Sequence, residues 1–312
     1  MIWLLMTIFE TILNFAAFFS SIFYLYLIYQ ANVLHSYCRI YLIILGIGML
    51  FMTSYGLSIY EYLAAGQKFA LLDEGVTFRS KTWEFIHEVG YALESMSMLF
   101  FSTERLIASK YPMQYNSEHF IVFIIFSLII SIGVALYFST SIHVYGILYS
   151  PTAVASVLDL SALLIMIFAW HTSLRVYRQT TGEVGLNRRF QMSEVFEWTS
   201  TLLPAALGAM ICKLLSSLAI WTWLILELTS SDYGVANFIY NNILNAYIVA
   251  LPWIIVFRNR NLKRKYFSKS SPSSNNNNNE KIRTLEGDEI KLRGSQNDYF
   301  EMLRDSWKHY EV

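Results

Sequence analysis

Residues 119–140, HFIVFIIFSLIISIGVALYFST, contain no Asp, Glu, Lys or Arg and no proline. A helix needs about 20 predominantly apolar residues to cross about 30 Å of hydrocarbon, because it rises by about 1.5 Å per residue. This stretch therefore predicts an α-helix that spans a membrane.

Six further stretches have a similar length and a similar apolar character. Each of them is bounded by a polar loop or by a loop with glycine or proline. They are residues 3–29, 39–64, 83–108, 154–176, 199–227 and 235–257. The chain of 312 residues is 55% hydrophobic and only 15% charged, against about 25% charged residues in an average soluble domain. The sequence predicts an all-α membrane protein, built as a bundle of seven transmembrane helices.

Basic residues decide the expected orientation, because lysine and arginine accumulate in cytoplasmic loops. With the N-terminus outside, the inner segments carry thirteen of them: Arg39, Arg105, Lys110, Arg175, Arg178, Arg188, Arg189, Arg258, Arg260, Lys263, Arg264, Lys265 and Lys269. The outer loops carry three, which are Lys68, Arg79 and Lys81. We therefore expect a multi-pass protein of the plasma membrane with its N-terminus outside and its C-terminus in the cytoplasm.

The charge balance changes after residue 257. Residues 1–257 hold 11 basic and 15 acidic side chains, whereas residues 258–312 hold 12 basic and 8 acidic ones. This split predicts a transmembrane domain over residues 1–257, followed by a cytoplasmic tail over residues 258–312.

The predicted tail has three parts. Its basic juxtamembrane strip, RNRNLKRKYFSK (258–269), either contacts anionic membrane lipid or only retains the topology. The serine- and asparagine-rich stretch SSPSSNNNNNE (270–280) lacks any periodicity and is typical of a disordered linker. A short amphipathic helix is expected at the end, where it would lie on the membrane or bind a partner, because Phe300, Leu303, Trp307 and Tyr310 share one helical face.

The predicted span 83–108 is the most polar of the seven. Its polar residues recur at steps of three and four, which aligns them on one helical face: Glu84, His87, Glu88, Tyr91, Glu94 and Ser95. Ionisable groups cost about 2.5 to 3.5 kcal/mol at the centre of a membrane helix on insertion scales, so they usually face the bundle interior. The stripe indicates either a water-accessible ligand cavity open to the outside or pairing with polar groups on neighbouring helices.

Lys213 lies near the middle of the sixth predicted span, at a depth similar to that of Glu94. A buried ion pair between them is expected, with Asp159 and Glu10 as alternative partners. Trp221 and Asn241 lie in the outer half of the last two spans, where such residues anchor the interface or line a cavity. The candidate ligand-binding set is Glu84, His87, Glu88, Tyr91, Glu94, Asp159, Lys213, Trp221 and Asn241.

The sequence predicts neither an enzyme nor a metal site. His87 and Glu88 begin like a zinc-protease helix, but Tyr91 stands where that motif has its second histidine. No serine with a suitably spaced histidine and no phosphate-binding glycine loop is visible in the sequence. We therefore expect no cofactor and no nucleic-acid partner.

The third predicted span ends in FFSTERLIASKYPMQYN (100–116), in which Glu104 and Arg105 stand side by side at the expected cytoplasmic boundary. An arginine beside a glutamate is ordinary at such a helix end. The pattern around the pair, however, resembles the E-R-x-x-A-x6-Y-E motif of nematode serpentine chemoreceptors of the Sra superfamily. Class e (Sre) is the most similar class, with class ab as its near relative. The matching residues are Glu104, Arg105, Ala108 and Tyr115, while Asn116 replaces the final Glu.

A second stretch, LNRRFQMSEV (186–195), is similar to the L-S-x-R-Y-Q-x-x-E-N segment that precedes the sixth helix in that group. The matching residues are Leu186, Arg189, Gln191 and Glu194, while Phe190 replaces Tyr and Val195 replaces Asn. The end of the last span, YIVALPWIIVFRNRNLKRK (247–265), looks like the Leu-Pro of the family followed by basic residues.

The resemblance implies a G-protein-coupled chemoreceptor that binds a small molecule and couples to a heterotrimeric G protein, in the ciliary or plasma membrane of sensory neurons. It also implies that Glu104 holds Arg105 at rest and releases it towards a Gα C-terminus when the sixth helix moves outward. The implied coupling surface is completed by Tyr115, Arg188, Arg189, Gln191 and Glu194.

Pro204 and Pro252 lie inside predicted spans near their cytoplasmic ends, where each would form either a hinge or a static kink. The alternative function is a multi-pass transporter or channel. No repeat relates the two halves of the sequence, which disfavours that alternative. The sequence identifies neither the ligand nor an oligomeric state.

Overall fold

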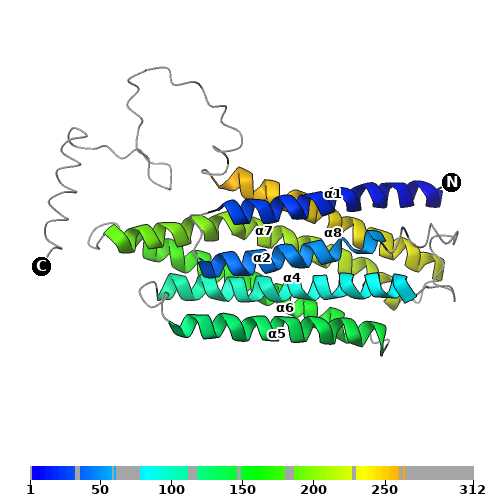
Figure 1. Cartoon of the computed structure of the whole chain (residues 1–312), viewed down its shortest axis with the longest axis horizontal. Helices are drawn as coiled ribbons and strands as arrows, with labels where there is room; N and C mark the ends of the chain where they lie inside the picture. The colour runs from blue at the N-terminus through cyan, green and yellow to red at the C-terminus, as the bar shows by residue number, and fades with distance from the viewer. Residues whose placement is uncertain are drawn as a thin grey trace, which may run out of the picture. The chain divides into compact units, whose positions relative to one another are not determined.

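The computed structural model describes residues 2–31, 36–57, 78–111, 118–145, 149–179, 186–226 and 230–259, together with residues 60 and 263. These residues form seven long helices: α1 (Ile2–Gln30), α2 (Ser36–Met52), α4 (Phe78–Lys110), α5 (Glu118–His143), α6 (Tyr149–Gln179), α7 (Leu186–Ile225) and α8 (Ser230–Arg258). Consecutive helices run in opposite directions along one long axis (Figure 1). The linker and the C-terminal helix predicted for the tail lie outside the described residues.

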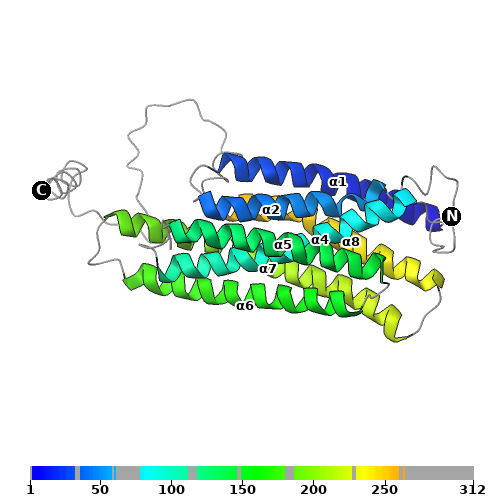
Figure 2. The same ribbon diagram turned by 60° about the horizontal axis from the view of Figure 1, so that its bottom comes forward.

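The helix α4 occupies the middle of the bundle (Figures 1 and 2). It packs against α2, α5, α6 and α7, whereas α1 packs against α2 and α8. Every side chain from Tyr91 to Met98 is buried, so this part of α4 has no surface towards the surroundings. The part of the polar stripe from Tyr91 to Ser95 is therefore enclosed by protein, whereas Glu84 and Glu88 are half-buried.

Six helices of the described residues are long and apolar enough to cross a membrane. They contain the spans Leu5–Gln30, Ser36–Leu57, Ile121–His143, Ser150–Arg178, Val195–Trp223 and Val235–Arg258. Large apolar side chains on these helices point away from the protein, for example Phe126 and Ile129 on α5, which are 62% and 64% exposed. Such a surface suits contact with hydrocarbon. The helix α4 has 33 residues but is too polar to be counted among the six by composition.

The span predicted over residues 39–64 corresponds in part to the candidate span Ser36–Leu57, which contains a break. The regular helix α2 ends at Met52, and a turn follows at Thr53 and Ser54. The Thr53 hydroxyl donates to the carbonyl of Leu50 at 2.7 Å, and the Ser54 hydroxyl donates to the carbonyl of Trp83 at 3.0 Å. Hydroxyl side chains that bond to backbone carbonyls compete with the helical hydrogen-bond pattern, which accounts for the break.

Two glycines allow α2 and α4 to cross at close range. A Cβ atom added to Gly90 would lie 2.6 Å from the carbonyl oxygen of Gly48 and 2.7 Å from the amide nitrogen of Met52. These neighbours are backbone atoms, so no side-chain rotation can relieve such a contact. Small residues are a common means of close helix packing in membranes.

We expect Gly90→Ala to destabilise the protein by about 1–3 kcal/mol, the usual cost of overpacking. Thermal unfolding of the purified chain in detergent measures this as a lower midpoint. Gly133→Ala on α5 is the matched control, because a Cβ atom there meets nothing within 4 Å. The control should keep or slightly raise the midpoint, since alanine is the better helix former. An unchanged midpoint for Gly90→Ala would contradict the close crossing.

Candidate functional site

A buried cluster of charged residues joins α4, α6 and α7 near their middles. The Lys213 ammonium of α7 donates to the Ser95 hydroxyl at 2.6 Å and to Asp159 Oδ1 at 3.0 Å. It also forms an ion pair with Glu94 Oε2. The expected pairing of Lys213 with Glu94 is thus present, and Asp159, offered as an alternative partner, joins it.

The charges of this cluster are almost completely removed from solvent. Lys213 is 3% exposed, Glu94 1% and Asp159 9%. One ammonium serves two carboxylates, and within the described part of the chain Glu94 Oε1 and Asp159 Oδ2 have no hydrogen-bond partner. Buried charges require pairing, because desolvation of a lone ion costs several kcal/mol. The cluster therefore ties three helices together around a single cation.

Glu10, the other alternative partner of Lys213, lies elsewhere. It is completely buried on α1 and faces Asn241 of α8. The amide of Asn241 also donates to Asn237 Oδ1 at 3.2 Å. Glu10 and Asn241 thus belong to the contact between α1 and α8, and the pairing of Glu10 with Lys213 is wrong.

A small polar chamber lies beside the charged cluster. Its volume is about 60 Å³, and its lining comes from α4 to α8: Glu88, Tyr91, Phe138, Ile142, Thr152, Ser217, Ile220, Asn237 and Tyr240. The Tyr91 ring stacks on Phe138 with 6.0 Å between centroids, and the Lys213 ammonium lies 4.7 Å from the centroid of the same ring. Tyr91 therefore forms a wall between chamber and cluster. The chamber has room for a few water molecules but not for a drug-sized ligand.

The remaining predicted ligand-binding residues do not line this chamber. His87 is buried, its Nδ1 atom lies 2.6 Å from the carbonyl oxygen of Met52, and its ring packs against Tyr55 with 5.5 Å between centroids. Glu84 and Trp221 are half-buried near the ends of α4 and α7. The stripe predicted on one face thus divides among three surroundings: His87 contacts α2, Glu88 and Tyr91 line the chamber, and Glu94 pairs with Lys213.

Glu104 and Arg105 lie near the other end of α4, three turns beyond Glu94. Arg105 Nε donates to Glu104 Oε2 at 2.6 Å, and an Arg105 terminal nitrogen donates to Glu104 Oε1 at 2.5 Å. The two side chains are 1% and 0% exposed. The guanidinium also lies 5.8 Å from the centroid of the Phe101 ring. The arginine is thus held by both carboxylate oxygens and buried.

The small residues after this pair allow close packing of the same helix end. Ala108 is completely buried, and the Ser109 hydroxyl donates to the Arg105 carbonyl at 2.7 Å. The motif of Glu104, Arg105 and Ala108 therefore describes a tightly packed terminus of α4.

The family comparison covers most of this helix and nearly all of the chain after it. The model of the Sre G protein-coupled chemoreceptor family matches residues 81–308, most of the chain. The chain belongs to this family. The predicted resemblance to class e is confirmed, and membership indicates a chemosensory receptor of the G-protein-coupled kind rather than an enzyme. Together with the apolar helices, it identifies a multi-pass membrane protein. No match to a curated protein was found.

The second stretch of the Sre receptor that resembles a family motif, residues 186–195, is helical. Residues 186–195 form the first turns of α7, which continues without interruption to Ile225. Arg188, Arg189, Gln191 and Glu194 therefore lie on the helix itself, while Tyr115 lies outside the described residues. The predicted span 199–227 began too late, because a polar helical extension reads as a loop. Since α7 has 40 residues, Pro204 lies near the middle of this helix, in the first half of the candidate span Val195–Trp223.

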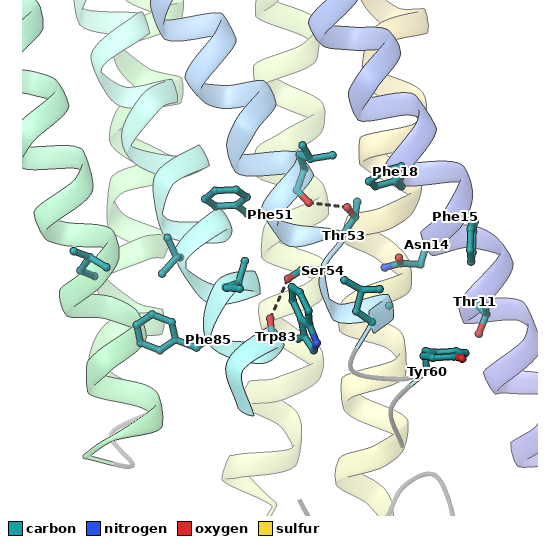
Figure 3. Close-up of a pocket in the computed structure, with 16 residues that line it drawn as sticks. Thr11, Asn14, Phe15, Phe18, Phe51, Thr53, Ser54, Tyr60, Trp83 and Phe85 are labelled. Atoms are coloured by element: carbon teal, nitrogen blue, oxygen red, sulfur yellow. Dashed lines mark hydrogen bonds between the residues drawn. The ribbon is translucent and has the colours of Figure 1, made fainter. Parts of the chain in front are cut away.

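A second, larger cavity was not predicted from the sequence. It has a volume of about 780 Å³ and is bounded by residues of α1, α2, α4 and α5 (Figure 3). None of the nine predicted ligand-binding residues lines it. Its lining is mostly apolar, so in the sequence these residues are indistinguishable from residues that face lipid. The only sequence signals are Asn14 inside an apolar helix and Gly56 after the hydroxyl residues that end α2.

Proposed function

We propose that this Sre receptor crosses the plasma membrane seven times, with α4 as its third span. The polar residues that lower the apolar character of α4 are buried among other helices, where charged groups are tolerated. A helix of 33 residues is about 50 Å long, more than the hydrocarbon thickness. The seven spans place the N-terminus and the C-terminus on opposite sides.

The proposed orientation is supported by the charges at the helix ends. Because the helices alternate in direction, one end of the bundle collects basic residues from four different helices: Arg39, Lys110, Arg175, Arg178 and Arg258. The opposite end has Arg79 and Lys81 at the start of α4. The positive-inside rule then assigns the first end, with the Glu104–Arg105 pair, to the cytoplasm.

We further propose that the chamber and the charged cluster below it form the ligand-sensing position, in the outer half of the bundle. A ligand there would meet Glu88 and Tyr91 first, with Glu84, His87, Trp221 and Asn241 around them and the cluster of Glu94, Asp159 and Lys213 beneath. The volume of about 60 Å³ is too small for most ligands. Binding must therefore widen the chamber and favour a state in which the helices around it have moved.

The helix α7 provides a mechanical connection from this position to the cytoplasm. Ser217 and Ile220 line the chamber, and Lys213 pairs with α4 and α6. The same helix continues through Pro204 to the coupling segment 186–195. A proline removes one backbone hydrogen bond and allows a hinge. Displacement of the outer part of α7 would therefore change the position of its cytoplasmic part.

The observation that carries the proposed switch is the burial of the Glu104–Arg105 pair. A buried arginine with both carboxylate contacts intact is out of reach of a partner protein. We propose that an outward movement of α7 opens this helix end, breaks the pair and presents Arg105 to the C-terminus of a Gα subunit. The two arrangements form a two-state switch that the ligand biases.

Glu104→Gln tests this function by weakening the restraint on Arg105. Replacing a charge-assisted hydrogen bond by a neutral one costs about 1.4 kcal/mol, so the active fraction should rise about tenfold. Basal nucleotide exchange measures this rise, with the receptor in lipid nanodiscs and a panel of heterotrimeric G proteins. Glu118→Gln, at the first residue of α5 on the same side, is the matched control. Equal basal exchange in the two variants would show that Glu104 does not restrain the receptor.

A further inference from the structure

The cavity of about 780 Å³ lies where α2 stops short of its neighbours. The regular part of α2 has 17 residues and is about 26 Å long, whereas α1 has 29 and α4 has 33 residues and they extend to about 44 and 50 Å. Beyond Met52 the regular helix gives way to a turn at Thr53 and Ser54, and Gly56 and Leu57 after this turn line the cavity together with residues of α1 and α4. Figure 3 shows the resulting groove between these two helices, with the turn at Thr53 and Ser54 in its wall.

The walls of this groove are apolar and largely aromatic. Phe15 and Phe18 come from α1, Phe51 from α2, and Trp83 and Phe85 from α4. The volume falls within the range of about 300 to 1,000 Å³ that small-molecule sites occupy. The lining contains no Asp, Glu, Lys, Arg or His among the described residues. A charged ligand group would be buried there without a partner, which selects an uncharged ligand.

The threonine and serine hydroxyl groups in the lining already have acceptors. The Thr11 hydroxyl donates to the Thr7 carbonyl at 2.7 Å. Thr53 and Ser54 donate to the carbonyls of Leu50 and Trp83, as described above. These three side chains therefore contribute shape to the groove and retain no free donor.

Asn14 is different, because its amide nitrogen has no acceptor in the described part of the chain. The side chain is 6% exposed and points from α1 towards the end of α2 (Figure 3). Its oxygen lies against Gly56, where an added Cβ atom would be only 2.2 Å from Oδ1. The amide oxygen is thus close to Gly56, while the buried amide nitrogen of this groove residue has no acceptor among the described residues. A buried donor without an acceptor costs about 1–3 kcal/mol, which a ligand acceptor would recover.

We propose that this groove binds an uncharged, elongated apolar molecule with a single hydrogen-bond acceptor, such as a medium-chain ester. The hydrocarbon lies along the aromatic walls, and the carbonyl oxygen accepts a hydrogen bond from Asn14 Nδ2. Asn14 is nine residues from the start of the span Leu5–Gln30, about 14 Å along the helix. A bilayer phospholipid keeps its ester groups at the interface and supplies no acceptor at this depth.

The groove is separate from the chamber, which lies on the other side of α4. Binding in the groove does not depend on the proposed function, which concerns only the physiological role of that binding. Its occupancy is measured without any G protein, on the full chain in nanodiscs of defined phospholipid. The probe is methyl decanoate with a photoreactive diazirine in its chain, and labelled peptides are identified by mass spectrometry. We expect saturable labelling of α1 and α2 around Phe15, Phe18 and Phe51. Labelling of the exposed α5 residues Phe126 and Ile129 should rise with probe concentration without saturating.

Competition distinguishes acceptor recognition from simple partitioning into lipid. Unlabelled methyl decanoate should displace the probe about fivefold more potently than dodecane, which has the same chain length and no acceptor, since one hydrogen bond contributes about 1 kcal/mol. In Asn14→Leu the two competitors should become equally potent. An ester advantage that persists in Asn14→Leu would overturn the role of Asn14. Groove labelling that methyl decanoate does not displace would identify bilayer lipid as the occupant and overturn the site.

A variant that fills the groove provides an independent test. Leu57 lines the groove and is 47% exposed, so Leu57→Trp adds volume without overpacking the core. Saturable labelling should be lost in this variant and kept in Ile129→Trp, a matched change at an exposed position of α5. Thermal midpoints close to that of the unchanged chain show that both variants are folded. Equal saturable labelling of the two tryptophan variants would overturn the proposal, whatever the outcome for G-protein coupling.

Discussion

Arg105→Ala should reduce ligand-evoked G-protein activation by at least about 30-fold while the receptor still reaches the cell surface. Truncating one member of a buried, hydrogen-bonded charge pair at an interface costs about 2–5 kcal/mol, which corresponds to this factor or more. The physical reason is that Arg105 contributes the only buried guanidinium among the described residues at this end of α4, which faces the cytoplasm in the proposed orientation. Nucleotide exchange on reconstituted G protein and antibody staining of intact cells measure the two quantities separately.

The single substitution leaves the Glu104 carboxylate buried without the guanidinium, so reduced folding must be separated from lost coupling. The double variant Glu104→Gln, Arg105→Ala removes the orphaned charge. It should fold like the unchanged chain and remain silent, although Glu104→Gln alone raises basal exchange. Activation of the double variant to the level of Glu104→Gln would show that the carboxylate acts without Arg105, and the proposed switch would be wrong.

Arg175→Ala is the matched control for the loss of one positive charge. Arg175 is exposed on the last turns of α6, at the same end of the bundle as Arg105. Its removal should leave ligand-evoked exchange within about twofold of the unchanged chain, because exposed charges contribute little. A loss as large as that of Arg105→Ala would mean that overall positive charge, and not the buried pair, determines coupling.

The helices could be predicted from the sequence because each depends on a local pattern. The length of each apolar stretch predicted a helix. The spacing of polar residues at steps of three and four placed Glu88, Tyr91 and Glu94 on the inward face of α4. The pairing of Lys213 with Glu94 could be predicted because the two residues lie at similar depths in their spans. The depth of a residue follows from the helical rise per residue once the ends of its span are known. The burial of α4 also explains why its composition alone falls short of a membrane span.

The groove and the break in α2 could not be predicted, because they depend on contacts between distant parts of the chain. The Ser54 hydroxyl bonds to the Trp83 carbonyl, and Gly48 meets Gly90 only after α2 and α4 have packed. A sequence search for ligand residues favours polar groups, whereas this groove has apolar walls with one free amide on Asn14. The polar first turns of α7 lie before the span predicted from the sequence, since a helix that extends beyond an apolar span need not be apolar itself.

Lys213→Met should destabilise the receptor by about 3–5 kcal/mol, the usual cost of breaking a buried ion pair by removing one partner. Methionine has a similar length but no charge, so Glu94 and Asp159 would face each other without the cation that they share. Low surface expression and a lower thermal midpoint in detergent measure this loss. Ser216→Ala is a neighbouring control on α7, because its hydroxyl donates only to the carbonyls of Cys212 and Tyr240.

The triple variant Lys213→Met, Glu94→Gln, Asp159→Asn separates charge balance from sensing. Without any buried charge, α4, α6 and α7 should pack against one another again. The free energy of unfolding should return to within about 1 kcal/mol of that of the unchanged chain, as for other buried ion pairs replaced by neutral residues. The restored receptor should still fail to respond to ligand. The charged cluster beneath Tyr91 is then gone, so a widening of the chamber can no longer change its ion pairs. A triple variant that folds and responds fully would mean that the cluster only holds the helices together and takes no part in sensing.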